Sequence, residues 1–150
     1  MKLRVPERPW LLLVEDSPAD VYLVQEAVRQ EGLDLEWGVA EDGESAIQLI
    51  ELMDTEKGTS IPKLLLLDIN IPRRSGNQVL EKFRNSARCR GVPVVMISSS
   101  DSAAERKRAS DQGASVYFRK PSSLDEFMLL GGIVRRLIEF HRPTVMHAGL

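Results

Sequence analysis

Short apolar runs alternate with longer amphipathic stretches along the chain, which is the pattern of repeated βα units. Three runs, at 10–14, 64–67 and 92–97, are continuously apolar and of strand length. Such runs are typical of strands that are covered on both faces of a parallel sheet. Two weaker strand candidates lie at 33–40 and 116–118. The pattern therefore predicts five strands.

Helix signals separate these runs. A serine followed by proline and then by an acidic residue, at 17–20, is typical of a helix start and predicts a helix to about Glu31. A similar signal at 123–126 predicts a final helix that runs to about Pro143. Two further helices are predicted over 44–53 and 78–85.

The helix predicted over 103–112 differs from the others, because its sequence AAERKRASDQ contains no large apolar residue. Most helix stability comes from burying an apolar face, so we expect this helix to dock weakly and to be mobile. An ordinary solvated edge helix would have the same sequence pattern.

The predicted element order gives an α/β fold, with a single open, doubly wound sheet of five parallel strands. We expect an N-terminal extension over 1–9, one domain over 10–141 and a C-terminal tail over 142–150. The 150 residues are 43% hydrophobic and 28% charged, which excludes disordered, collagen-like and repeat classes.

Charge and cysteine content narrow the functional classes. The chain has 20 basic and 22 acidic residues, so it lacks the basic excess that drives nucleic-acid binding. The single cysteine, Cys89, cannot form an internal disulfide, and no His/Cys cluster has zinc-ligand spacing. No apolar stretch approaches the length of a membrane helix. These features predict a soluble cytoplasmic protein without direct nucleic-acid or membrane contact.

Polar residues follow the predicted strands. Glu15 and Asp16 come after the first strand, Asp68 after the third, Ser98 after the fourth and Lys120 after the fifth. Ligands of doubly wound sheets bind beyond the carboxyl ends of the strands, where these residues would meet. Taken singly, Asp68 could be a surface carboxylate or a helix cap, and Lys120 a surface lysine.

Three carboxylates in one pocket repel one another unless a cation is present. Oxygen ligands without His or Cys favour Mg²⁺. Asp68 could then act as a nucleophile that forms an aspartyl phosphate. Lys120 and the hydroxyl of Ser98 are suitable companions for an incoming phosphoryl group, because phosphoryl transfer depends on positioning and charge neutralisation.

Four segments, in this order and spacing, resemble the receiver domains of two-component response regulators: LLLVEDSPAD, LLLLDINIP, PVVMISSS and GASVYFRKPSSLDEF. The resemblance covers nearly the whole chain. It implies the flavodoxin-like (βα)5 receiver fold and a phosphoacceptor switch rather than an enzyme. It also implies that Asp68 accepts a phosphoryl group from a phosphohistidine of a histidine kinase.

The resemblance further implies a Mg²⁺ site formed by Asp16, Asp68 and the backbone carbonyl of Asn70, with Glu15 acting through water. Ser98 and Lys120 would hold the phosphoryl group.

Two other family features concern switching and phosphoryl lifetime. Tyr117 stands where the family has its switch aromatic residue, which is expected to turn inward when Ser98 moves toward the phosphate. The side chains of Asn70 and Ser100 would tune the phosphoryl lifetime.

A narrower resemblance is to stand-alone regulators that are paired with phytochrome-type histidine kinases. It rests on the SPAD segment, on D-x-N-x-P followed by two basic residues, and on KPSSLDEF. Three serines depart from the commoner family residues: Ser75, Ser98 and Ser99. Since only a short tail follows the last helix, we expect no DNA-binding output domain. Output would use the surface of the 103–112 helix, the fifth strand and the final helix, through a homodimer.

Three alternatives stay open at this point. A phosphohydrolase with an aspartyl-phosphate intermediate would need an acid two residues after the nucleophile, where this chain has Asn70. A flavodoxin-like nucleotide or flavin binder would need a phosphate-binding loop where VEDSPAD has two adjacent carboxylates. The third alternative is a metal-binding scaffold of receiver type that does not switch.

Overall fold

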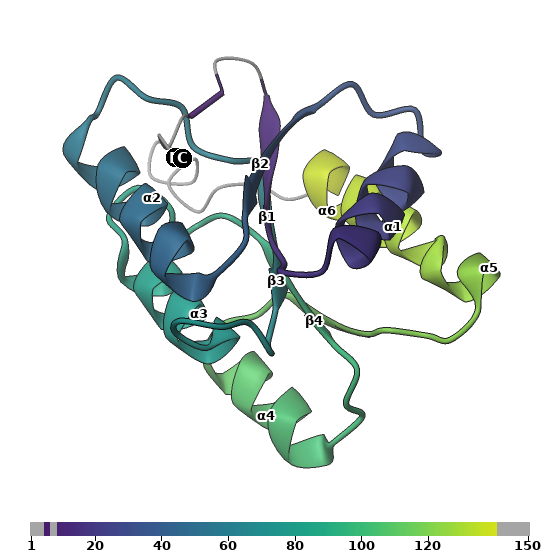
Figure 1. Ribbon diagram of the computed structural model, residues 1–150. Coiled ribbons are helices and arrows are strands. Elements are labelled where there is room, and N and C mark those ends of the chain that lie inside the picture. Colours follow the sequence, from purple (N-terminus) through teal and green to yellow (C-terminus); the bar gives the residue numbers. More distant parts are fainter. Residues whose placement is uncertain (1–4, 7–8, 141–150) are drawn as a thin grey trace.

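Five parallel strands form one sheet in the order β2-β1-β3-β4-β5 (Figure 1). This strand order confirms the predicted doubly wound sheet. The computed structural model describes residues 5–6 and 9–140. The strands are β1 (Trp10–Val14), β2 (Glu36–Ala40), β3 (Leu64–Asp68), β4 (Val94–Ser98) and β5 (Val116–Arg119).

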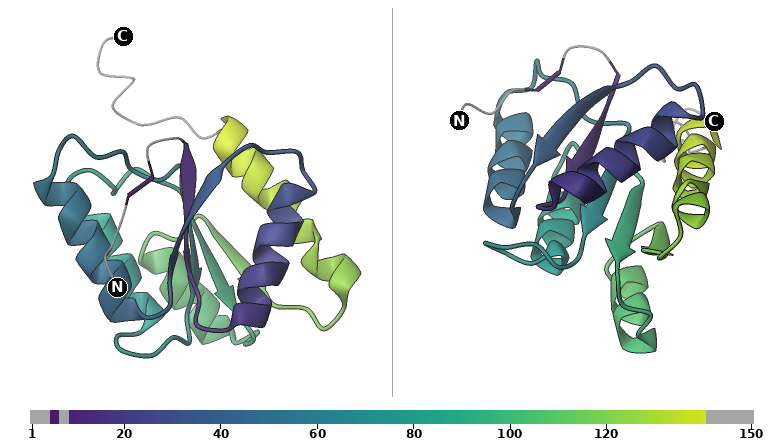
Figure 2. Two further views of the ribbon diagram at one scale, coloured as in Figure 1. Left: turned by 45° about the horizontal axis from the view of Figure 1, so that its top comes forward. Right: turned by 45° about the vertical axis from the view of Figure 1, so that its right-hand side comes forward.

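Helices cover both faces of the sheet (Figures 1 and 2). On one face lie α2, α3 and α4, and on the other lie α1, α5 and α6. The helices are α1 (Pro18–Arg29), α2 (Gly43–Thr55), α3 (Gly76–Asn85), α4 (Ala103–Asp111), α5 (Leu124–Phe127) and α6 (Leu129–Phe140).

The leucine run of β3 shows why the central strands are continuously apolar. Successive side chains point to opposite faces, so Leu65 and Leu67 pack with the α2/α3 layer. Leu64 and Leu66 pack with the α1/α6 layer. All four are fully buried. The central position of β3 thus follows from its sequence, because a strand can bury every residue only when helices cover both faces of the sheet.

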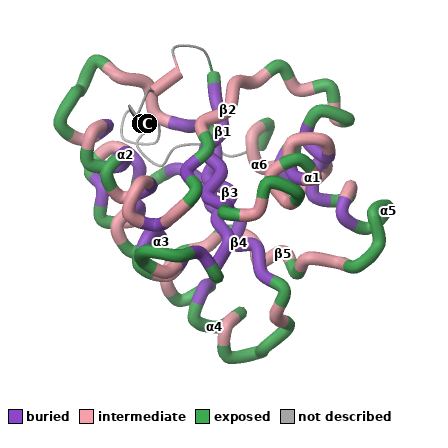
Figure 3. Tube along the Cα trace, viewed as in Figure 1, coloured by how far each residue is buried: buried purple, intermediate pink, exposed green. Residues whose placement is uncertain are grey.

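Helix α4 is the least buried of the longer helices, as predicted, and Figure 3 draws it mostly as exposed. Ala109 is its one buried residue. Its first turn is capped by Ser102, whose hydroxyl accepts a hydrogen bond from the Glu105 amide. The helix therefore depends more on capping and surface ion pairs than on an apolar face.

Two predicted strands begin later than expected. Strand β4 starts at Val94 rather than at residue 92. Pro93 has no N–H group, so it cannot donate a hydrogen bond to the neighbouring strand. Its carbonyl still accepts a hydrogen bond from the Leu65 amide. Strand β2 starts at Glu36 rather than at residue 33, although Leu33 and Leu35 still pack beside the α1 layer.

The predicted final helix is divided into α5 and α6 at Met128. The Gly131 amide donates to the Met128 carbonyl, three residues back instead of four, so the hydrogen-bond ladder tightens there. Its predicted end, at about Pro143, lies outside the described residues, as does the predicted tail over 142–150. No helix in the described part of the chain has the length and apolarity to cross a membrane.

The described part of the predicted N-terminal extension packs on the domain. Val5 lies against the core on the α2/α3 side. The carbonyl of Pro6 accepts a hydrogen bond from the Ser60 hydroxyl, which in turn accepts one from the Trp10 indole. Residues 5–6 therefore contribute to the α2/α3 layer.

Candidate functional site

The strands bring the predicted polar residues to one edge of the sheet. Glu15 and Asp16 follow β1, Asp68 ends β3, Ser98 ends β4, and Lys120 follows β5. Because all strands are parallel, these carboxyl ends lie along the same edge. In the sheet register Asp68 pairs with Ile97, the residue before Ser98.

Three carboxylates meet at this edge. One oxygen from each of Glu15, Asp16 and Asp68 lies within 4.8 Å of the others. Glu15 and Asp68 are buried, with 1% and 4% exposure, whereas Asp16 is exposed. Backbone amides fix the two buried side chains: the Ser17 amide donates to Glu15 Oε1 at 3.1 Å and the Asn70 amide to Asp68 Oδ1 at 2.9 Å.

Lys120 supplies the positive charge in this cluster. Its Nζ donates to Asp68 Oδ2 at 2.7 Å, to Glu15 Oε2 at 3.0 Å and to Asp20 Oδ2 at 2.7 Å. All three donors of the ammonium group are therefore engaged. Burial alone lowers the pKa of Lys120, but the hydrogen bonds to the three carboxylates outweigh it, and the pKa lies above its ordinary value. Lys120 is charged at physiological pH.

Burial also raises the pKa of Glu15, to about 7. Its hydrogen bond with Asp68 acts in the same direction, while the Lys120 ammonium lowers the value. The buried pair of carboxyl groups is thus only partly compensated by the lysine.

The acidic cluster has the donor set of a hard divalent cation. It offers three carboxylate oxygens within 4.8 Å of one another, one of them on an exposed side chain open to solvent. Mg²⁺ binds such oxygens and keeps several waters. The residues present therefore fit the cation expected from the sequence.

Ser98 and Tyr117 are linked through the loop after β4. The Ser98 hydroxyl accepts a hydrogen bond from the Ser100 amide at 3.0 Å. The Tyr117 hydroxyl donates to the Ser100 carbonyl at 3.0 Å. The Tyr117 ring is partly buried and packs against the core. That this side chain turns further inward on phosphorylation stays a prediction.

Asn70 and Ser100 border the site from two loops. Asn70 is exposed, two residues after Asp68. The hydroxyl of Ser100 accepts a hydrogen bond from the Ser102 amide at the start of α4. Ser100 thus connects the end of β4 to the capping residue of α4, because its amide contacts Ser98 and its hydroxyl contacts Ser102.

Two polar partners were missed by sequence reasoning. Asp20 contacts Lys120, although its position in the helix suggested only a favourable charge in the first turn. Glu105 contacts both Ser98 and Tyr117, although it too resembles an ordinary first-turn acid. The available signal was the position of each acid in the first turn of a helix that follows a strand with a site residue at its end.

The loop between β3 and α3 runs close to the site. At Gly76 a β-carbon would lie 2.5 Å from the Asp68 carbonyl oxygen, so only glycine fits there. Arg73 and Arg74 have φ angles of 54° and 90° in the same loop. Their guanidinium groups pair with Asp42, the N-cap of α2, and with Glu44 in its first turn. This loop therefore has a constrained backbone beside Asp68.

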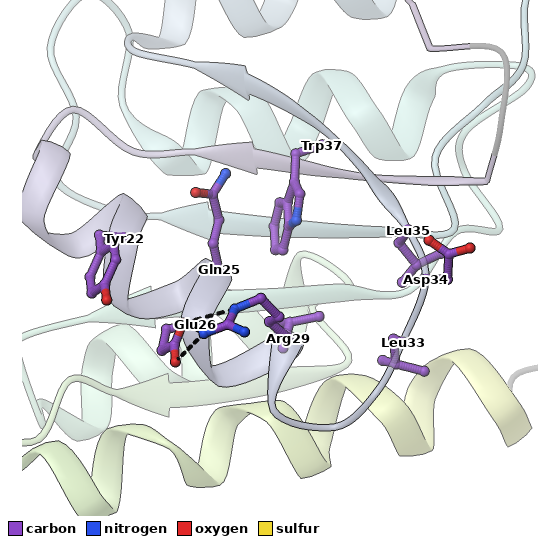
Figure 4. Close-up of a pocket in the computed structure, with 9 residues that line it drawn as sticks. Tyr22, Gln25, Glu26, Arg29, Leu33, Asp34, Leu35 and Trp37 are labelled. Carbon is purple, nitrogen blue, oxygen red and sulfur yellow. Dashed lines mark hydrogen bonds and ion pairs between the residues drawn. The ribbon is translucent and has the colours of Figure 1, made fainter.

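A separate pocket of about 430 Å³ lies between α1 and the edge strand β2 (Figure 4). Tyr22, Trp37, Leu33 and Leu35 are among its lining residues. None of the residues of the acidic cluster lines it. This pocket is therefore distinct from the site at the strand ends.

Known proteins are similar to this chain in sequence and in fold. The family model of the response regulator receiver domain matches residues 11–130. Response regulator Rcp1 of Synechocystis is 31% identical over 124 residues, covering 82% of this chain and 84% of that protein. The probable methanogenesis regulatory protein FilR2 of Methanothrix harundinacea is 33% identical over 118 residues, covering 77% of this chain and 74% of that protein.

Solved structures of response regulators are similar to this fold. The crystal structure of the phosphorylated cyanobacterial phytochrome response regulator RcpA has a TM-score of 0.80 and 27% identity, covering 91% of this chain and 98% of that chain. The Mn(2+)-bound form of Rcp1 has a TM-score of 0.78 and 29% identity, covering 90% and 98%. The chain belongs to the family of response regulator receiver domains.

Proposed function

We propose that this chain is a phosphoacceptor switch, in which Asp68 receives a phosphoryl group from a phosphohistidine of a histidine kinase. The observation that carries the proposal is the arrangement around Asp68: a buried carboxylate in an acidic cluster, with the Lys120 ammonium 2.7 Å from Oδ2. Membership of the receiver family supports the same role. A histidine kinase is therefore the upstream partner that the proposal requires.

In the transfer, a carboxylate oxygen of Asp68 forms a bond to phosphorus while the bond from phosphorus to the donor nitrogen breaks. The electron pair of that bond stays on the imidazole nitrogen of the donor. The product is an acyl phosphate on Asp68. Lys120 donates hydrogen bonds to the transferred oxygens, and Ser98 does the same from the end of β4.

Asp16 and Asp68, with the Asn70 backbone carbonyl, would hold Mg²⁺, and Glu15 would act through water. The bound cation supplies charge that offsets the repulsion between these carboxylates and the incoming phosphoryl group. The oxygen set at the strand ends supports this assignment, as does the Mn(2+)-bound form of the relative Rcp1.

A phytochrome-type kinase is the narrower proposal for the partner. The motifs SPAD and KPSSLDEF support it, together with the likeness to RcpA, which is described as a phytochrome response regulator. Turnover of external phosphate esters is not expected, since Asn70 stands where a phosphohydrolase of this type needs an acid. Only self-phosphorylation and self-dephosphorylation would occur, with Asn70 and Ser100 affecting the lifetime of the phosphoryl group.

For output we propose the surface formed by α4, β5 and α6, acting through a homodimer. Helix α6 exposes Leu129 and Phe140, with 65% and 73% exposure, and α4 buries only Ala109. Tyr117 connects α4 and β5 to the end of β4. If sedimentation and hydrogen exchange over 103–120 both stay unchanged on saturation with beryllofluoride and Mg²⁺, this surface is not the output face.

The phosphoacceptor assignment is tested by intact mass after incubation with Mg²⁺ and acetyl phosphate. The wild-type chain should gain one phosphoryl group, and Asp68→Asn should gain none. Asp54→Asn is the matched control. Asp54 accepts a hydrogen bond from the Ser86 hydroxyl and is not part of the acidic cluster. A stable mass gain in Asp68→Asn would contradict the assignment.

A further inference from the structure

Glu105 connects the two side chains of the proposed switch. Its Oε2 lies 3.2 Å from the Tyr117 hydroxyl, which shares its one proton between this oxygen and the Ser100 carbonyl at 3.0 Å. The same oxygen accepts a hydrogen bond from the Ser98 hydroxyl at 3.4 Å. Ser98 is fully buried at the end of β4, and Glu105 lies in the first turn of α4. One carboxylate oxygen thus joins the sheet edge, α4 and β5.

This contact is not the usual use of an acid at this helix position. In α3 the corresponding residue, Gln78, reaches back and accepts from the amide of the capping serine, Ser75, at 2.8 Å. In α4 the amide of the capping Ser102 donates instead to Ser100 Oγ at 3.1 Å. The Glu105 side chain is therefore directed to the switch residues rather than to its own helix cap.

The Ser98 hydroxyl has a single proton to donate. In the structure that proton faces Glu105, since the lone pairs of Ser98 Oγ serve the Ser100 amide. A phosphoryl group on Asp68 needs the same proton, so the two acceptors exclude each other. The phosphoryl group also adds a charge of about −1.5 to −2, which repels a neighbouring carboxylate.

We propose that Glu105 is a positioning residue that competes with the phosphoryl group for the Ser98 hydroxyl and thereby holds the unphosphorylated arrangement of α4. The inference rests on the proposed function, because it requires a phosphoryl group at Asp68. When Ser98 turns to that group, Glu105 loses one of its two bonds to the switch residues.

The neighbouring contacts explain how this loss reaches the surface. The Arg106 guanidinium lies over the Tyr117 ring, 4.6 Å from its centroid, and pairs with Asp101 at 2.7 Å. Apart from Ala109, α4 has no buried side chain to keep it in place. The first turn of α4 is therefore held largely by polar contacts, and a changed bond at Glu105 is enough to shift it.

The test is a titration of the full chain with beryllofluoride in the presence of Mg²⁺, followed by backbone amide NMR. Glu105→Gln removes the charge and weakens the acceptor. We expect it to bind beryllofluoride about threefold to tenfold more tightly than wild type, as expected for losing one competing hydrogen bond of moderate strength. The Mg²⁺ affinity without beryllofluoride should stay unchanged, since Glu105 is not part of the acidic cluster.

The Ser98→Ala background separates competition from a general effect on α4. There, Glu105→Gln should give no further gain, because the contested proton is absent. Asp111→Asn is the matched control, since it removes one charge at the end of α4, where Asp111 forms an exposed ion pair with Lys107. It should bind beryllofluoride as wild type does.

Three results would overturn the inference: unchanged or weaker binding by Glu105→Gln, an equal gain in the Ser98→Ala background, or the same gain in Asp111→Asn. Failure of the wild-type chain itself to bind beryllofluoride would overturn the proposed function, and this inference with it. The two failures are therefore distinguishable.

Discussion

Lys120 Nζ lies 2.7 Å from Asp68 Oδ2, although the two residues are 52 positions apart in the sequence. Each side chain is largely shielded from water, with 13% and 6% exposure. The contact joins the ends of β5 and β3, which are separated by β4 in the sheet. The cation that would bind a transferred phosphoryl group is thus already in place beside the proposed acceptor.

Lys120→Ala should destabilise the metal-free protein. Three carboxylates lose their shared partner, and leaving buried charge unpaired costs about 3 kcal/mol of unfolding free energy. Mg²⁺ should restore part of this loss, because it supplies positive charge to the same oxygens. Urea denaturation in EDTA and in Mg²⁺ measures both effects. Lys107→Ala, which breaks an exposed pair with Asp111, should change little. If Mg²⁺ restores nothing, the cluster does not bind it as proposed.

Asp16→Ala should lower Mg²⁺ affinity more than Glu15→Ala. Glu15 is buried, and its oxygens already accept from Ser17 and Lys120, whereas Asp16 is exposed at the mouth of the cluster. Asp16 can therefore turn to a cation without breaking these bonds. Isothermal titration calorimetry of both variants gives the comparison. An equal loss in the two variants would mean that Glu15 ligates the cation directly.

The stability of the metal-free protein should depend on pH through Glu15. Its pKa rises from 4.5 to about 7 on folding. The folded state therefore binds the extra proton, and the stability from this group is present below pH 4.5 and is lost as pH rises through about 7. Mg²⁺ competes with that proton, so its stabilising effect should grow over the same range.

The measurement is the melting temperature in EDTA and in Mg²⁺ between pH 5 and pH 8, values that bracket the raised pKa of about 7. Glu15→Gln, which has no proton to lose, should flatten the dependence in EDTA. A wild-type dependence that survives in Glu15→Gln would assign the titration to another group.

Two adjacent glycines of α6 should respond oppositely to alanine. At Gly131 a β-carbon would lie 2.1 Å from the Ala27 carbonyl oxygen, so Gly131→Ala must push α6 away from α1. We expect a loss of about 1–3 kcal/mol of unfolding free energy. At Gly132 nothing lies within 4 Å. Gly132→Ala should gain up to about 1 kcal/mol, because alanine restricts the unfolded chain. Guanidinium denaturation measures the free energy of unfolding of both variants. Similar changes in the two variants would mean that α1 and α6 do not pack this closely.

The apolar runs determined the sheet. Strand β1 was predicted with its observed bounds, and β3 within one residue, because continuous burial leaves an unbroken apolar signal. The edge strand β2 was predicted less well. Four of its five residues are not fully buried, and apolar and polar residues do not alternate regularly along it. Its start depends on pairing with β1, which is a tertiary contact.

The sequence also determined which residues meet at the strand ends, since parallel strands bring their carboxyl ends to one edge. Glu15, Asp68 and Lys120 could be grouped on that ground alone. The roles of Asp20 and Glu105 could not. Both acids sit in a first helical turn, where an acid is favourable in any protein through the helix dipole.

Only the packing of α1 and α4 against the strand ends turned Asp20 toward Lys120 and Glu105 toward Ser98. Periodicity predicts which face of a helix is buried, but the rotation and tilt of a polar helix depend on its neighbours. For α4, which buries Ala109 alone, the sequence contains almost no information on that orientation. The sequence therefore determined which polar residues lie at the strand ends. The contacts that link these residues to the helices were decided by tertiary packing.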